Sequence, residues 1–172
     1  MKKIFITILY FSLVFASCKK SIIGIGSTVQ QPVKSGVAVA TNLNNDLLLK
    51  LVNDKRATGC NCGITIMPSV APLTWNNLLA AAALAHSKDM NTNNYFSHTS
   101  LDGRSAGDRI TVVGYKWSAY GENIASGQTS EQAVFDAWIT SEGHCKNIMN
   151  ANFKEMAVAR DGKYWTQEFG KQ

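Results

Sequence analysis

The 172-residue chain is 45% hydrophobic and 17% charged, which is ordinary for a globular protein and excludes a low-complexity or disordered chain. Its length suits one domain with a sizeable core plus appendages. The formal net charge is +5, but without Lys2 and Lys3 the remaining chain has 15 basic and 12 acidic residues. Because no basic cluster occurs beyond Lys19-Lys20, this small surplus argues against a nucleic-acid partner.

The N-terminus has the three parts of a secretory signal: two lysines, an apolar run over residues 4–15, and small residues before Cys18. The run is too short for a membrane-spanning helix. A cysteine directly after small residues resembles the lipobox of bacterial lipoproteins, whose cysteine carries more than one acyl chain. We therefore expect residues 1–17 to be a signal peptide and Cys18 to be lipidated, which would anchor the protein in the bacterial cell envelope outside the cytoplasm. Ordinary signal cleavage near Ser17 is the alternative.

Residues 18–41 are rich in Gly, Ser, Val and Gln, and we expect them to form a flexible tether ahead of a domain over residues 42–172. The leucine spacing over residues 42–57 predicts a first helix, which Gly59 ends. A second helix is expected to begin with Thr74 as its N-cap and to end within residues 91–94.

Three cysteines of the expected domain, Cys60, Cys62 and Cys145, are disulfide candidates because an exported chain meets an oxidising compartment. Cys60 and Cys62 are too close in sequence to bond to each other comfortably, so we expect either of them to pair with Cys145. That bond would close a loop of roughly 80 residues. The alternative is a thiolate metal site of all three cysteines and His144, although Cys-x-Cys differs from the Cys-x-x-Cys spacing of zinc knuckles.

His86 falls on the apolar face of the second helix, where it could be a buried, hydrogen-bonded imidazole or a member of a site. A short helix is expected over residues 105–114, with Asp108-Arg109 solvated or paired locally. Residues 129–132 form a capping-box pattern that opens a third long helix with little polar face.

Two strand-like runs, residues 153–160 and 163–169, flank Asp161-Gly162, which predicts a hairpin. Helices followed by a hairpin indicate an α+β protein in which helices flank a small antiparallel sheet.

Three polar residues are candidates for one site: His98, Glu122 and His144. A glycine directly precedes both Glu122 and His144, which predicts that turns present them at the two ends of the third long helix. Two imidazoles and a carboxylate could bind zinc with an open position, or could act as general acid and base near neutral pH. They could also simply connect loops by hydrogen bonds.

Residues 73–169 resemble the CAP or SCP superfamily of cysteine-rich secretory proteins, antigen 5 and plant pathogenesis-related proteins, and are most similar to its short bacterial branch. The matching motifs are Ala85-His86-Ser87-x-x-Met90, Tyr95-Phe96-Ser97-His98, Asp102-Gly103-Arg104, Gly121-Glu122-Asn123-Ile124-Ala125, Trp138-x-x-Ser141-x-Gly143-His144-x-x-Asn147-Ile148-Met149 and Tyr164-Trp165-Thr166-Gln167-x-Phe169-Gly170. The resemblance implies a three-layer α-β-α sandwich. It also implies a cleft lined by a His-Glu-Glu-His tetrad, where family members have bound divalent metals.

By this resemblance His98, Glu122 and His144 match three positions of the tetrad, and Ser141 stands at the fourth, where eukaryotic members have glutamate. Glu142 is its neighbour and a further candidate ligand. We therefore expect a divalent metal, zinc, held by His98, Glu122 and His144.

Three functions remain open for the chain. Eukaryotic members of the family bind sterols and fatty acids, so the first is a binding module for a lipid, glycan or peptide. The second is a metal-assisted hydrolase of the envelope, in which His98, Glu122 and His144 would be catalytic. The chain has neither Gly-x-Ser-x-Gly nor His-Glu-x-x-His and no clear nucleophile, which disfavours an enzyme. The third is a structural envelope protein without a ligand.

Overall fold

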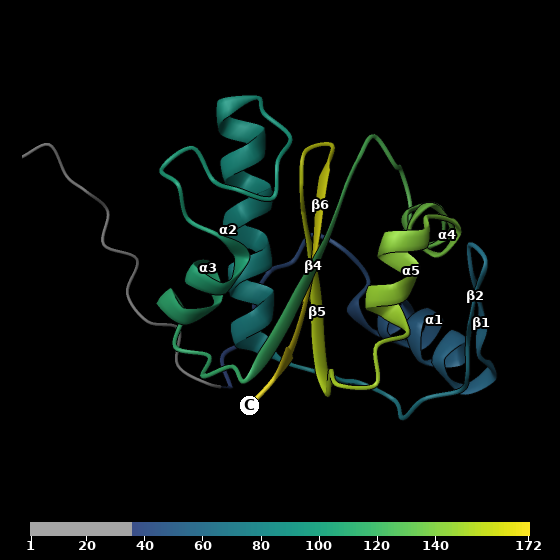
Figure 1. Ribbon diagram of the computed structural model, residues 1–172. Helices are drawn as coiled ribbons and strands as arrows, with labels where there is room; N and C mark the ends of the chain where they lie inside the picture. Colours follow the sequence, from purple (N-terminus) through teal and green to yellow (C-terminus); the bar gives the residue numbers. More distant parts are fainter. Residues whose placement is uncertain (1–35) are drawn as a thin grey trace, which may run out of the picture.

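The structure, a computed structural model, describes residues 36–172, so the expected signal peptide and Cys18 lie outside the described residues. Figure 1 shows a central sheet with helices packed on both faces. The elements are α1 (Asn45–Thr58), β1 (Cys60–Cys62), β2 (Thr65–Met67), β3 (Thr74–Trp75), α2 (Asn77–Asn93), α3 (Ala106–Val112), β4 (Ala119–Ser126), α4 (Glu131–Thr140), α5 (Glu142–Ile148), β5 (Glu155–Asp161) and β6 (Tyr164–Lys171). α2 and α3 lie on one face of the sheet, and α1, α4 and α5 lie on the other. The expected three-layer α+β arrangement is confirmed.

The central sheet has the strand order β3-β5-β6-β4. β6 pairs antiparallel with both β5 and β4, whereas β3 pairs parallel with β5 over two residues. The expected hairpin is confirmed: β5 and β6 are joined at Gly162, whose φ of 56° suits glycine. A smaller sheet of β1 and β2 forms a separate hairpin.

Glu122 lies inside β4, so the expected turn at this position is wrong. Gly121 has a packing role there, because a Cβ at this position would lie 2.7 Å from the ring of Phe153. His144 likewise lies within α5 and not in a turn. The structure thus presents Glu122 from β4 and His144 from α5. This helix lies on the face of the sheet opposite to α2.

The start of α2 differs from the sequence expectation. The N-cap of α2 is Asn76, whose side-chain oxygen accepts hydrogen bonds from the backbone of Leu78 and Leu79, while Thr74 belongs to β3. The N-cap of α4 is Ser130. α4 buries one face only, through Val134, Phe135 and Trp138, and is less enclosed than its sequence suggested.

The core lies on both sides of β6, in which residues 164–170 are all buried. Tyr164 and Trp165 fill this core. Val39 packs against the α2–α3 side and Thr41 is buried, so the packed domain begins before residue 42. Among residues 36–172, no helix is both long and apolar enough to cross a membrane.

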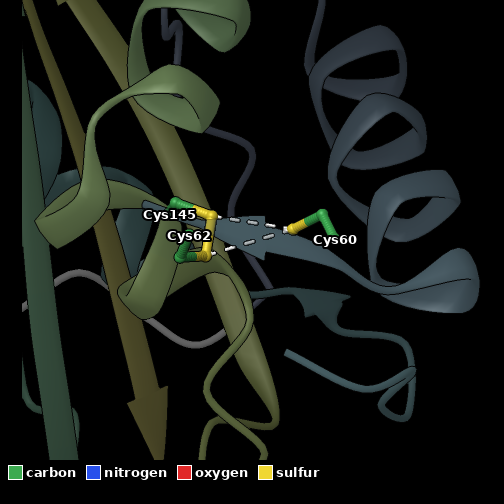
Figure 2. A group of neighbouring side chains, drawn as sticks. All are labelled: Cys60, Cys62 and Cys145. Atoms are coloured by element: carbon green, nitrogen blue, oxygen red, sulfur yellow. Dashed lines mark hydrogen bonds between the residues drawn. A yellow bond between two sulfur atoms is a disulfide. The ribbon is translucent and has the colours of Figure 1, made fainter. Parts of the chain in front are cut away.

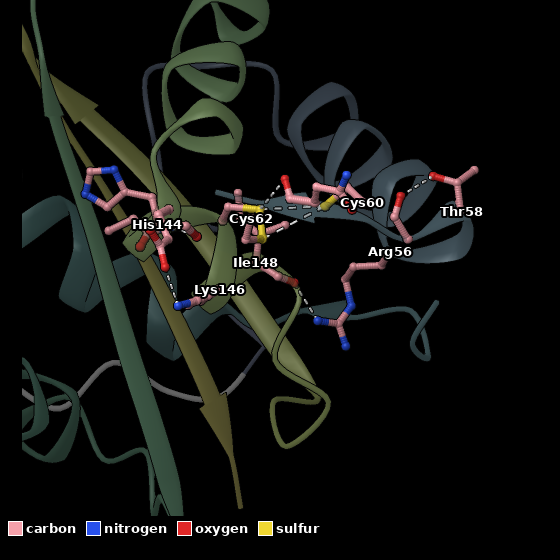
Figure 3. The surroundings of a disulfide bond; sticks show 12 residues. Arg56, Thr58, Cys60, Cys62, His144, Lys146 and Ile148 are labelled. Carbon is pink, nitrogen blue, oxygen red and sulfur yellow. Dashed lines mark hydrogen bonds and ion pairs between the residues drawn. A yellow bond between two sulfur atoms is a disulfide. The ribbon is translucent and has the colours of Figure 1, made fainter. Parts of the chain in front are cut away.

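A disulfide between Cys62 and Cys145 joins β1 to α5 (Figure 2). This confirms the expected bond to Cys145 and identifies Cys62 as its partner. Cys60 is a free thiol beside the bond. On the other side of the same region, the Arg56 guanidinium donates a 2.6 Å hydrogen bond to the carbonyl of Ile148, which ties α1 to the end of α5 (Figure 3).

Candidate functional site

Glu122 is the centre of the candidate site, and its carboxylate is buried with 4% of the side chain exposed. One oxygen, Oε1, lies 2.7 Å from Nδ1 of His98. The other, Oε2, accepts a hydrogen bond of 2.5 Å from Nη2 of Arg109. Burial alone would raise the pKa of Glu122, but the His98 hydrogen bond and the Arg109 charge outweigh it and hold that pKa below its usual value. Glu122 is therefore a buried anion with both oxygens engaged.

Arg109 reaches this carboxylate from α3 and also fixes the loop that carries His98. Its Nη1 donates hydrogen bonds to the carbonyls of His98 and Arg104 and to the hydroxyl of Ser100, at 3.0 to 3.2 Å. The expectation that Arg109 is solvated or paired locally is wrong, although Asp108 does cap its own helix. One sign of this role was visible in the sequence: Arg109 lies among the small and apolar residues of the expected short helix, next to Ile110.

His86 is fully buried on α2 and has the expected hydrogen-bonded role, because its Nε2 lies 2.9 Å from the carbonyl of Ser97. The same nitrogen lies 3.9 Å from Oε2 of Glu122. Burial lowers the pKa of His86, against the pull of the nearby carboxylate, and so favours the neutral ring. His86 thus both supports the His98 loop and lines the inner side of the carboxylate.

Glu168 is a member of the site that the sequence analysis did not identify. It lies on β6 directly opposite Glu122 on β4, and it is fully buried. Burial and the negative charge of Glu122 raise the pKa of Glu168 well above its usual value, which favours the neutral form of this carboxyl. In the sequence, Glu168 is the one charged residue of the strand-like run 164–169, which could have indicated a buried carboxyl but not its contact with Glu122.

The two remaining candidates, His98 and His144, differ in exposure and charge. The His98 side chain is 58% exposed, and its hydrogen bond to Glu122 raises its pKa. His144 is half-buried, and its pKa is lowered first by burial and then by the positive charge of His98. Nδ1 of His144 is buried without a protein hydrogen-bond partner.

Asn123 on β4 and Asn147 on α5 hold the strand that bears Glu122 against the helix that bears His144. The Asn147 amide donates to the carbonyl of Glu122 at 3.1 Å, and the Asn123 amide donates to the carbonyl of His144 at 3.2 Å. These bonds fix α5 against β4, so the position of His144 relative to Glu122 does not depend on loop conformation.

Glu142 stands apart from these groups. Its carboxylate forms an exposed ion pair of 2.6 Å with Lys146 and lies beside Gly63 in the β1–β2 turn. His98, Glu122 and His144 also fall short of a preassembled three-ligand set. In the described part of the chain, only Cys60, Cys62 and Cys145 form a group of three or more potential ligands with ligand atoms all within 4.8 Å of one another.

Comparison with known proteins places this geometry in a family. Residues 49–169 match the model of the cysteine-rich secretory protein family, CAP. In Bacillus subtilis, the uncharacterized membrane protein YlbC is 34% identical over 124 residues, and the uncharacterized protein YkwD is 42% identical over 100 residues. These matches cover 72% and 57% of this chain but only 36% and 39% of the relatives, so the chain spans well under half of their length.

Solved structures agree with the sequence matches. An extracellular protein of Bacillus anthracis that contains an SCP domain is 33% identical, with a TM-score of 0.67 over 74% of this chain and 40% of that protein. An outer surface protein of Borrelia burgdorferi is 20% identical, with a TM-score of 0.64 over 74% of this chain and 91% of that one, which is a likeness of fold alone. Because the family model covers residues 49–169, most of the chain, this chain belongs to the cysteine-rich secretory protein (CAP) family.

Proposed function

We propose that this protein is an extracytoplasmic, membrane-tethered binding module that holds a zinc ion through His98 and His144 and receives a lipid, glycan or peptide beside it. The observation that carries the proposal is the 2.7 Å contact between Nδ1 of His98 and the buried Glu122. A ring nitrogen fixed by a carboxylate leaves the other nitrogen, Nε2, free to bind a metal, and such outer-shell carboxylates orient metal-binding histidines.

The donor set fits zinc in a different way from the one the sequence suggested. Glu122 has one oxygen on His98 and the other on Arg109, so it is better suited to orient His98 than to ligate the ion. His98 and His144 remain as ligands, with water completing the coordination. Glu142 is not part of the proposal because its carboxylate pairs with Lys146. When bound, zinc would act as a Lewis acid toward a polar group of the ligand.

Two protein ligands favour binding over hydrolysis. Catalytic zinc sites in enzymes use three protein ligands plus water, because a firmly held ion is needed to activate that water. With Glu122 engaged elsewhere, this site has two imidazoles. A zinc ion that is held less firmly and has more coordination positions open suits reversible binding of a ligand.

The loop that carries His98 also presents apolar surface. Phe96 is 54% exposed and Leu101 is 67% exposed, although both belong to a loop held by buried hydrogen bonds. Phe96 is further ordered by stacking on Tyr164, with ring centroids 6.2 Å apart. Exposed apolar side chains on a rigid loop are typical of binding surfaces. They support a ligand that has an apolar part as well as a polar group for the metal.

Zinc binding tests the proposal directly. Titration calorimetry on the oxidised protein at pH 7.5 should give one site, and His98→Ala or His144→Ala should each lower its affinity by more than ~10-fold. Hydrogen bonding to Glu122 raises the pKa of His98. Protons therefore compete with zinc for this ring at a higher pH than they would for an ordinary histidine, and zinc affinity should fall as the pH decreases through the pKa of His98.

The matched control is Glu142→Gln, which changes a carboxylate that pairs with Lys146 and stands apart from the site. It should bind zinc like the wild type. Equal zinc affinity in the wild type and in His98→Ala would overturn the proposed site.

The proposed tether rests on the N-terminal sequence and on two similar proteins, one an extracellular protein and one a membrane protein. We expect Cys18→Ser to move the protein from the membrane fraction of the bacterial cell to the soluble fraction, because the acyl chains are attached through Cys18. Fractionation with salt washes and immunoblotting measures this. A variant that remains in washed membranes would contradict the lipid anchor.

A further inference from the structure

Three cysteine sulfurs gather where the β1–β2 hairpin meets α5 (Figure 2). Alternate residues of a strand share a face, so β1 presents Cys60 and Cys62 on the same side, toward Cys145. Sγ of Cys60 lies 3.6 Å from Sγ of Cys145 and 4.0 Å from Sγ of Cys62. The third sulfur is thus in contact with both sulfurs of the disulfide.

These distances distinguish two uses of the third cysteine. In thiol–disulfide exchange the attacking sulfur approaches along the line of the S–S bond, and Cys60 lies beside that bond at nearly equal distances from both sulfurs. The arrangement therefore favours a site that uses all three sulfurs together.

A zinc–sulfur bond of about 2.3 Å in a tetrahedral site places two thiolates roughly 3.8 Å apart. The two distances of Cys60 lie on either side of this value. We propose that, once the disulfide is reduced, Cys60, Cys62 and Cys145 bind one zinc ion, and that the disulfide replaces this site in the oxidised protein. The two states exclude each other because they use the same two sulfurs.

The fourth ligand is a water molecule in this proposal. The sequence suggested His144 for this place, but its ring points away from the sulfurs (Figure 3). Cys62 and Cys145 are fully buried, whereas Cys60 is half-buried, so Cys60 forms the open side of the site. The positive charge of Lys55, which acts on the Cys60 sulfur, offsets part of the negative charge of three thiolates.

The chemistry balances with a dithiol as the reductant. The dithiol gives two electrons and two protons to the Cys62–Cys145 bond and becomes a disulfide itself, leaving two thiols in the protein. Zinc then binds the three thiols as thiolates and releases three protons. No group of the His98–Glu122 centre takes part, so this site and the proposed imidazole site are separable.

Cobalt(II) is the probe, because thiolate ligation gives charge-transfer absorption in the near ultraviolet that imidazole ligation does not. The full chain carrying Cys18→Ala is reduced with dithiothreitol, freed of it without oxygen, and titrated with cobalt and then zinc. We expect the band in the reduced protein, its loss when zinc is added, and no band in the oxidised protein. Cys60→Ser should lower the band by about a third and the affinity by more than ~100-fold, since losing a direct ligand exceeds outer-shell losses.

Two controls keep the outcome decisive. Cys60→Ser retains the disulfide, so its fold can be checked in the oxidised state. The double variant His98→Ala/His144→Ala should keep the thiolate band when it is reduced and should lose zinc binding when it is oxidised. If reduction loosens the fold, zinc should restore the near-ultraviolet circular dichroism. A reduced protein without the band, or equal cobalt affinity in Cys60→Ser, would overturn the three-sulfur site and leave the imidazole proposal intact.

Discussion

Replacing Arg109 with methionine should lower the free energy of unfolding by about 3–5 kcal/mol, because it leaves the buried Glu122 carboxylate without its cation. The side chains of this pair are 3% and 4% exposed, so water cannot compensate for the loss. Arg109 also donates three hydrogen bonds to the His98 loop, which would lose its anchor. Guanidinium chloride unfolding followed by circular dichroism measures the effect.

The matched control for this variant is Arg104→Met. Arg104 also pairs with a carboxylate, that of Asp102, but both side chains are about half exposed. Removing an exposed pair costs ~1 kcal/mol or less. Similar losses for Arg104→Met and Arg109→Met would contradict the view that a buried ion pair organises the site.

The loss of unfolding free energy in Arg109→Met should also depend on pH, and the pKa of Glu122 sets the direction of this dependence. The pKa of Glu122 is held below its usual value in the folded protein, so its contribution to stability is present above the unfolded-state value, near 4.3, and is lost as pH falls through the folded value. The difference in stability between wild type and Arg109→Met should therefore narrow at acidic pH.

Removing the disulfide with Cys145→Ala should destabilise the oxidised protein by about 4 kcal/mol, since the bond joins residues 83 apart in sequence and restricts the unfolded chain. Cys145 is the informative position, because a change at Cys62 would leave Cys60 close enough to Cys145 to form a replacement bond. Denaturant unfolding without reductant gives the measurement.

Cys60→Ala is the control for the disulfide, because it removes a neighbouring sulfur and leaves the Cys62–Cys145 bond in place. It should cost much less than Cys145→Ala. Under reducing conditions the wild type should lose most of its advantage over Cys145→Ala. Equal stability of the two variants without reductant would mean that the bond does not constrain the chain.

The elements that sequence alone predicted are those with local signals. The β5–β6 hairpin could be predicted because Asp161-Gly162 separates two apolar runs. β4 could not, because Gly-Glu-Asn has little strand propensity and the strand is held by pairing with β6 along its whole length. Tertiary pairing therefore placed Glu122 on a strand where the flanking glycine suggested a turn.

The candidate site was predictable only in part for a similar reason. His98 and Glu122 were expected together and are in contact. Two partners decide the role of Glu122: Arg109 from α3 and Glu168 from β6. Neither contact has a short-range signature in the sequence. The sequence led us to expect Glu122 as a metal ligand, and the structure adds that its carboxylate is buried and hydrogen-bonded to both His98 and Arg109.

The most direct test of this account is an anomalous difference map from crystals of the oxidised protein soaked in zinc. We expect a zinc peak bound to Nε2 of His98 and to the ring of His144, with Glu122 still hydrogen-bonded to Nδ1 of His98 and Arg109. A peak on the Glu122 carboxylate with Arg109 displaced, or no peak at either histidine, would contradict the account.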